Sequence, residues 1–132
     1  MIVLDASVIA NFLGDDGPNG ENARRAIPDS LEISVPDLAD VETTASLRRR
    51  WIAKDIDDQR FSDALSILAD LPFQRYPSSL FLQRAYELRF NVSAYDAMYV
   101  ALAEALDCEL LTTDARLANA TGPRCTIRVL TS

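Results

Sequence analysis

Four acidic residues stand where carboxylates can meet and do chemistry. Asp5 and Asp114 each follow a short, mostly apolar run that predicts a strand. Glu42 and Asp96 each lie near the start of a segment with the periodicity of a helix. In a parallel sheet, the carboxyl ends of the strands and the starts of the helices that follow share one edge, where ligands bind. We therefore expect these four side chains to converge at that edge.

Each carboxylate also has a purely structural interpretation. Aspartate is favoured as the capping residue at the start of a helix, which would account for Asp5 and Asp114. The pattern Ser93-x-x-Asp96 resembles a capping box. Glu42 could interact favourably with the dipole of its own helix. Taken one residue at a time, the sequence leaves both interpretations open.

The four residues together favour a metal site. Asp96 precedes an apolar run that should carry it into the interior, and no lysine or arginine lies between Arg89 and Arg116 to pair with it. Converging carboxylates repel one another unless a cation neutralises them. Ligands that are all oxygen suit Mg²⁺ or Mn²⁺, which assist phosphoryl chemistry. Ser7 and Thr113, each beside a strand-end aspartate, could hold water around the ion or form local turn hydrogen bonds.

The composition excludes several other chemistries. None of the 132 residues is histidine, which rules out Ser-His-Asp and Cys-His catalysis and histidine zinc sites. The chain is 48% hydrophobic and 25% charged, which is typical of a globular domain. Its formal net charge of -7 argues against a protein that binds nucleic acid by charge alone.

The cysteines and the apolar segments indicate a cytoplasmic protein. Cys108 and Cys125 form no CxxC motif and are too few for a disulfide framework or a zinc site, so we expect reduced thiols. The N-terminal segment has no basic flank, and Asp5 interrupts its apolar run, so we expect no secretory signal. No apolar stretch is long enough for a membrane span.

Alternating strand and helix patterns predict an α/β protein with a mainly parallel sheet covered on both faces. The predicted strands are residues 2–4, 31–35, 73–76, 109–112 and 126–130. The predicted helices begin near residue 6 and after residue 57, and cover residues 21–27, 38–54, 78–90, 93–107 and 114–118, with a loop at 14–20. The length favours a single domain over residues 1–132.

Four motifs carry a resemblance to a known family. They are VLDASV with Asp5, PDLADVETTASLRRR with Glu42, ELRFNVSAYDAMYVALAEAL with Asp96, and LLTTDARL with Asp114. Together they span nearly the whole chain, and the sequence resembles the PIN-domain ribonucleases, specifically the VapC-like toxins of toxin–antitoxin pairs. The first motif alone is weak, whereas the tyrosine–aspartate run followed by LLTTD is specific.

The resemblance implies a three-layer α/β/α sandwich with a parallel sheet of about five strands. It also implies an endoribonuclease that depends on Mg²⁺ or Mn²⁺, is usually a homodimer, and is inhibited by a VapB-like antitoxin. The expected mechanism is hydrolysis of RNA phosphodiesters by metal-activated water.

The family's acidic residues fall on four positions of this chain. Asp5 and Asp96 would be the primary metal ligands, and Glu42 and Asp114 would complete the coordination or hold metal-bound water. The family's small hydroxyl residues fall on Ser7 and Thr113. Many relatives carry a further acid two residues after the last aspartate, where this chain has Arg116. This departure puts a fully occupied second metal site in doubt and could instead provide a phosphate contact.

The basic residues suggest contacts with RNA or with a protein partner. Arg48, Arg49 and Arg50 are consecutive, so they spread around a helix, and only Arg49 lies close to the face of Glu42. The cluster is either a solvated surface or a contact for an RNA backbone or an acidic partner segment. We count Arg49, Arg116 and Trp51 as candidate contacts, because arginine and aromatic residues are enriched at interfaces.

Other functions fit the sequence less well. A haloacid-dehalogenase-like phosphohydrolase needs Asp-x-Asp after the first strand, and this chain has Asp5-Ala6-Ser7. A response-regulator receiver needs a lysine at the end of its last strand, but Lys54 is in the middle of the chain. The remaining alternatives are another metal-dependent α/β phosphohydrolase with an acidic pocket and a catalytically silent PIN-fold interaction module.

Overall fold

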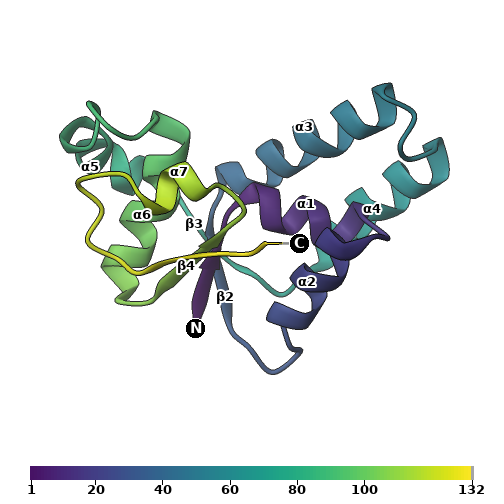
Figure 1. Ribbon diagram of the computed structural model, residues 1–132, viewed down its shortest axis with the longest axis horizontal. Helices are drawn as coiled ribbons and strands as arrows, with labels where there is room; N and C mark the ends of the chain where they lie inside the picture. The colour runs from purple at the N-terminus through teal and green to yellow at the C-terminus, as the bar shows by residue number, and fades with distance from the viewer. Residues whose placement is uncertain (132) are drawn as a thin grey trace.

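A five-stranded parallel sheet lies between two groups of helices in the computed structural model, which describes residues 1–131 (Figure 1). The strand order is β3-β2-β1-β4-β5, so the first strand is central. The strands are β1 (Ile2–Leu4), β2 (Ile33–Pro36), β3 (Gln74–Tyr76), β4 (Glu109–Thr112) and β5 (Ile127–Val129). This arrangement confirms the predicted α/β/α sandwich with a parallel sheet.

The helices divide between the two faces of the sheet (Figure 1). The group on one side is α1 (Ala6–Gly14), α2 (Pro18–Ala26), α3 (Leu38–Ile52) and α4 (Asp58–Asp70). The group on the other side is the 3₁₀ turn η1 (Ser78–Phe81), α5 (Leu82–Glu87) and α6 (Ala94–Leu106), with α7 (Ala115–Ala118) packed against β4 and β5. Within residues 1–131, no helix is long and apolar enough to cross a membrane.

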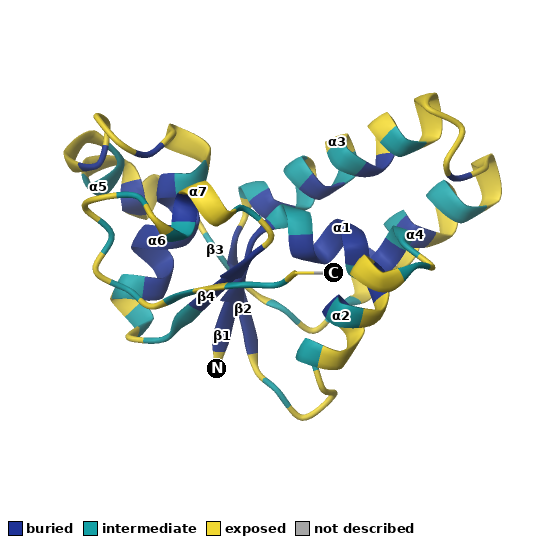
Figure 2. Ribbon diagram, viewed as in Figure 1, coloured by how far each residue is buried: buried dark blue, intermediate teal, exposed yellow. Residues whose placement is uncertain are grey.

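The most deeply buried residues lie in the central strands and in helix α6. Strand β1 is entirely apolar, β4 has two leucines at its centre, and Val3, Leu4, Leu110 and Leu111 have no exposed surface. Helix α6 is buried continuously from residue 97 to 103, because it packs across β1, β2 and β4 (Figure 2). A helix that is apolar on all sides belongs in such a position. The rigid centre of the molecule therefore carries the starts of α1 and α6 and the end of β4.

Two predicted segments differ from the structure. Helix α2 begins at Pro18, inside the predicted loop, because proline is well suited to the first turn of a helix. Gly20 lies so close to the preceding turn that an added Cβ would be 1.8 Å from the Asp15 carbonyl oxygen. The predicted helix 78–90 is instead a 3₁₀ turn followed by a short α-helix that ends at Glu87.

Candidate active site

The four carboxylates line one cavity at the carboxyl edge of the sheet. Asp5 follows β1, Asp114 follows β4, Glu42 lies in the first turns of α3, and Asp96 lies in the first turn of α6. Their side chains border a cavity of about 220 Å³, together with Tyr99 and four other residues. The structure thus brings together the residues that the sequence singled out.

Asp5 is the most buried of these carboxylates, with 6% of its surface exposed. It caps α1, and its Oδ1 accepts hydrogen bonds from the Val8 backbone N–H (3.2 Å) and the Ser7 hydroxyl (2.5 Å). Its Oδ2 accepts a hydrogen bond from the Thr112 hydroxyl. Burial raises the pKa of Asp5, the hydrogen bonds lower it, and the charge of Asp96 raises it further. The capping role and a role in the cavity therefore coexist in one side chain.

Glu42 is held by a tyrosine that the sequence interpretation did not single out. The Tyr99 hydroxyl donates a 2.7 Å hydrogen bond to Glu42 Oε1. Burial raises the pKa of Glu42, and the charges of Asp96 and Asp5 raise it further. Burial and the adjacent Glu42 carboxylate also raise the pKa of the Tyr99 phenol, so Tyr99 remains a neutral donor. The signal for Tyr99 was its place one turn after Asp96, at i+3 on the same helix face.

Asp96 and Asp114 are both partly buried at the cavity. Burial raises the pKa of Asp96, and the Asp114 charge raises it further, whereas Ser93 and Arg116 lower it. Ser93 caps α6 and accepts a 3.1 Å hydrogen bond from the Asp96 backbone N–H, as the capping-box pattern predicts. Asp114 caps α7 and accepts a 2.9 Å hydrogen bond from the Arg116 backbone N–H.

The small hydroxyl residues connect the two strand ends. Ser7 donates to Asp5 and accepts a 3.3 Å hydrogen bond from the Thr113 backbone N–H. Thr112, which is fully buried, donates to Asp5 and accepts a 3.1 Å hydrogen bond from the Asp114 backbone N–H. The sequence interpretation placed Thr113 beside the carboxylates, but its side chain is exposed and the buried hydroxyl is that of Thr112. Alternation along β4 explains the difference, because successive side chains point to opposite faces.

The three candidate contact residues lie in different surroundings. Arg49 borders the acidic cavity, and its charge lowers the pKa of Glu42. The Arg116 side chain is 93% exposed and lies 3.5 Å from Asp114 Oδ1. Trp51 is at the far end of α3, where its Nε1 donates a 2.6 Å hydrogen bond to Asp58 and its ring packs against Phe61. Arg49 and Arg116 therefore flank the cavity, and Trp51 belongs to another surface.

The donors around the cavity fit a hard divalent cation by their chemistry. They are carboxylate oxygens, supported by hydroxyls, and three of the four carboxylates have pKa values raised by burial. Repulsion among these acids contributes to all three pKa shifts, and a bound cation would remove it. Among residues 1–131, no three acidic or cysteine side chains are already arranged as a metal cage.

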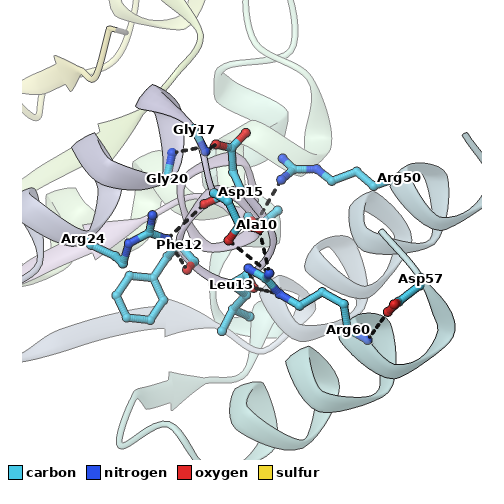
Figure 3. A network of polar contacts seen from close by, with 11 residues as sticks. Ala10, Phe12, Leu13, Asp15, Gly17, Gly20, Arg24, Arg50, Asp57 and Arg60 are labelled. Atoms are coloured by element: carbon cyan, nitrogen blue, oxygen red, sulfur yellow. Dashed lines mark hydrogen bonds and ion pairs between the residues drawn. The ribbon is translucent and has the colours of Figure 1, made fainter. Parts of the chain in front are cut away.

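The opposite end of α1 carries the reverse charge pattern. Arg50, from α3, donates to the Ala10 carbonyl (3.2 Å) and to Asn11 Oδ1 (2.6 Å). Arg60, from α4, donates twice to the Leu13 carbonyl. Arg24, from α2, donates to the carbonyls of residues 12 and 15 (Figure 3). We call Arg24, Arg50 and Arg60 the arginine clamp, because they join three helices to the last turn of α1.

Comparison with known proteins agrees with this geometry. A family model described as PIN domain matches residues 2–123. Ribonuclease VapC1 of Mycobacterium tuberculosis is 38% identical over 129 residues, which covers 97% of this chain and 96% of the relative. Ribonuclease VapC9 of the same organism is 40% identical over 130 residues, which covers 98% of each chain.

Solved structures share the fold at low sequence identity. The crystal structure of M. tuberculosis VapC20, described as a sarcin-ricin loop cleaving toxin, has a TM-score of 0.70 at 16% identity and covers 90% of this chain and 94% of its own. VapBC2 from Rickettsia felis, bound to a DNA fragment from its promoter, has a TM-score of 0.65 at 11% identity and covers 99% and 100% of the two chains.

Proposed function

The chain belongs to the PIN-domain family, and we propose that it is a metal-dependent endoribonuclease that acts as the toxin of a toxin–antitoxin pair. The observation that carries this proposal is the cavity lined by Asp5, Glu42, Asp96 and Asp114, whose pKa pattern favours a cation. Full-length relatives at 38% and 40% identity are named ribonucleases, which supports RNA as the substrate.

The acidic residues would hold Mg²⁺ or Mn²⁺. Asp5 and Asp96 are proposed as the primary ligands, with Glu42 and Asp114 completing the coordination. When bound, such an ion supplies Lewis-acid polarisation of a phosphodiester and lowers the pKa of a water molecule it coordinates, which makes hydrolysis at neutral pH feasible. The chain has no histidine to act as a general base at neutral pH. The part proposed for its carboxylates is therefore to bind the cation and hold it in place.

The residues around the acids keep them oriented. Ser7 and Thr112 donate hydrogen bonds to opposite oxygens of Asp5, which fixes the plane of its carboxylate. Tyr99 does the same for one oxygen of Glu42. Arg49 and Arg116 lie at the rim of the cavity, where a guanidinium can form an ion pair with an RNA phosphate or with an acidic segment of an antitoxin.

The proposed protein partners are an antitoxin and a second copy of the chain. Structures that share the fold include complexes described as VapBC2 and as a toxin–antitoxin complex from Klebsiella pneumoniae, which supports a VapB-like inhibitor. Leu82 and Tyr86, one turn apart on α5, are 61% and 58% exposed, and Phe90 just beyond is 81% exposed (Figure 2). Such an apolar surface favours a homodimer. The proposed place of action is the cytoplasm, where RNA is available.

RNA cleavage by the purified protein tests the proposal. Single-stranded RNA should be cut in Mg²⁺ or Mn²⁺ and left intact in EDTA. The variants Asp5→Asn and Asp96→Asn should each lose at least about a hundredfold in rate, a loss typical of catalytic electrostatics. Asp70→Asn removes a charge from the exposed end of α4 and serves as the matched control.

The outcome separates the proposal from its alternatives. Equal cleavage by the wild type, Asp5→Asn and Asp96→Asn would overturn the assignment of these residues. No cleavage of any RNA in either metal, by a folded protein that still binds an antitoxin, would favour the silent interaction module. Hydrolysis of phosphomonoesters without RNA cleavage would favour the other class of phosphohydrolase.

A further inference from the structure

The two cysteines lie just before strands β4 and β5, which pair in parallel. The parallel register pairs Leu110 with Ile127, and each cysteine is two residues before its member of this pair. Continuing the register sets Cys108 beside Cys125. The Leu110 backbone N–H donates to the Thr126 carbonyl at 2.9 Å, so the two segments are held together where strands β4 and β5 begin to pair.

A register continued by two residues places the two cysteines at the separation that a disulfide bond needs. Neighbouring strands lie about 4.8 Å apart, and disulfides join Cα atoms separated by about 4.4–6.8 Å. Side chains that face each other in a ladder point to the same face of the sheet. Cys108 and Cys125 indeed border the same cavity, with Glu104, Asp107 and Arg124 among its other walls. Both thiols are partly exposed, so a small oxidant can reach them.

We propose that Cys108 and Cys125 form a reversible disulfide within the chain, with a low-molecular-weight disulfide as the oxidant. One protein thiolate attacks a sulfur of the oxidant, breaks its S–S bond and releases one small thiol. The second protein thiolate then attacks the protein sulfur of this mixed disulfide, forms the Cys108–Cys125 bond and releases the second small thiol. The two protons lost by the cysteines end on the two small thiols.

The reaction is slow at neutral pH, because little of either thiol is ionised. Burial raises the pKa of the Cys125 thiol to about 11, and burial also raises that of Cys108. The charged groups that disfavour a thiolate here are the carboxylates of Glu104, Asp107 and Glu109. Opposing them are Arg84, the N-terminal amine and Arg124, which borders the same cavity. Because the thiolate is the nucleophile, the bond forms faster as the pH rises.

The bond would fasten the edge strand β5 to β4. It closes a loop that contains Asp114 and α7, and β5 is an edge strand with a neighbour on one side only. A bridge that closes a loop of this length restricts the unfolded chain, and the expected rise in Tm is roughly 5–10 °C for a domain of this size.

Peptide mapping of the native, full-length protein tests the proposal. Reduced protein is incubated with oxidised glutathione at pH 7 and pH 9, quenched with acid, alkylated and digested with trypsin. We expect peptide 90–116 linked to peptide 125–128, an intact mass lower by two hydrogen atoms, and faster linkage at pH 9. The linked form should melt at the higher temperature, and dithiothreitol should reverse both changes.

Single-cysteine variants and the unfolded chain are the controls. Cys108→Ser and Cys125→Ser should each take up at most one glutathione and gain no thermal stability. Protein unfolded in urea should link under the same oxidant, which shows that the reagent works. Separate glutathione adducts on both cysteines, a bond between two chains, or two free thiols in the native protein under conditions that link the unfolded chain would each overturn the proposal.

Discussion

At its N-terminus, helix α1 meets four carboxylates, and at its C-terminus it meets the arginine clamp (Figure 3). The helix dipole favours an acid at the first end and cations at the second, but it favours only a fraction of a charge at each. At the C-terminal end every cation donates to a carbonyl or an amide oxygen. At the N-terminal end the carboxylates outnumber the cations beside them, and burial and repulsion raise the pKa values of Asp5, Glu42 and Asp96.

The difference separates stability from function along one helix. The arginine clamp joins α2, α3 and α4 to α1 through satisfied hydrogen bonds, so its loss should cost stability and leave the chemistry intact. The acidic end is electrostatically unfavourable in the absence of a cation, so neutralising it should cost activity and preserve stability. Each prediction below tests one side of this division.

The largest stability change is expected at the clamp. Arg60→Ala removes two hydrogen bonds of 3.2 and 3.1 Å to the Leu13 carbonyl and a 3.0 Å ion pair with the exposed Asp16. It should lower the free energy of unfolding by about 2–3 kcal/mol, mainly through the bonds to Leu13, since hydrogen bonds to charged groups are among the stronger ones and exposed ion pairs contribute little. Urea unfolding measures the change, and the specific cleavage activity of the folded protein should stay near that of the wild type. Arg48→Ala, at an exposed position nearby, is the control and should be almost neutral. A large loss of activity in folded Arg60→Ala would break the division.

A divalent cation should stabilise the acidic end. At ten times its dissociation constant, Mg²⁺ or Mn²⁺ should raise the free energy of unfolding by about 1.4 kcal/mol. Thermal melts of EDTA-treated protein, with and without the cation, measure this shift. Arg60→Ala should keep the shift, because its lesion lies at the other end of α1, whereas Asp96→Asn should lose most of it. An equal shift in Asp96→Asn would show that the cation binds elsewhere.

Local sequence patterns predicted the carboxylates at the N-terminal end of α1 but not the arginine clamp at its C-terminal end. Asp5, Asp96 and Asp114 were found because strand ends and helix starts are recognisable in sequence, and a parallel sheet brings them to one edge. The Arg50 and Arg60 contacts of the clamp join residues 39 to 47 positions apart, and those of Arg24 join residues 9 and 12 positions apart, which no local pattern reports. The sequence did predict that Arg48, Arg49 and Arg50 spread around their helix and that Arg49 lies nearest Glu42, and Arg49 indeed borders the cavity. It did not predict that Arg50 reaches the last turn of α1.

A smaller effect is expected from pH in the absence of divalent cations. The folded-state pKa of Asp96 is raised, so the folded protein binds its proton more tightly than the unfolded chain does. Its unfavourable contribution is therefore fully present at neutral pH and is lost as the pH falls through the folded pKa. Asp96→Asn lacks this group, so its stability advantage over the wild type should be greatest at pH 7 and should shrink towards pH 4. Urea unfolding of both proteins in EDTA measures the difference, and a constant difference across this range would contradict it.

The smallest change tests a single hydrogen bond at the acidic end. Tyr99→Phe keeps the buried ring and removes the hydroxyl that donates a 2.7 Å hydrogen bond to Glu42 Oε1. That hydrogen bond lowers the Glu42 pKa against the effect of burial, so its loss should raise the Glu42 pKa further and move the acidic limb of the rate profile to higher pH. The loss of one hydrogen bond corresponds to about a fivefold lower rate near neutral pH, with recovery at higher pH. Tyr86→Phe, on the exposed face of α5, should leave the profile unchanged. A uniform loss at every pH would instead mean that Tyr99 positions Glu42 without tuning its charge.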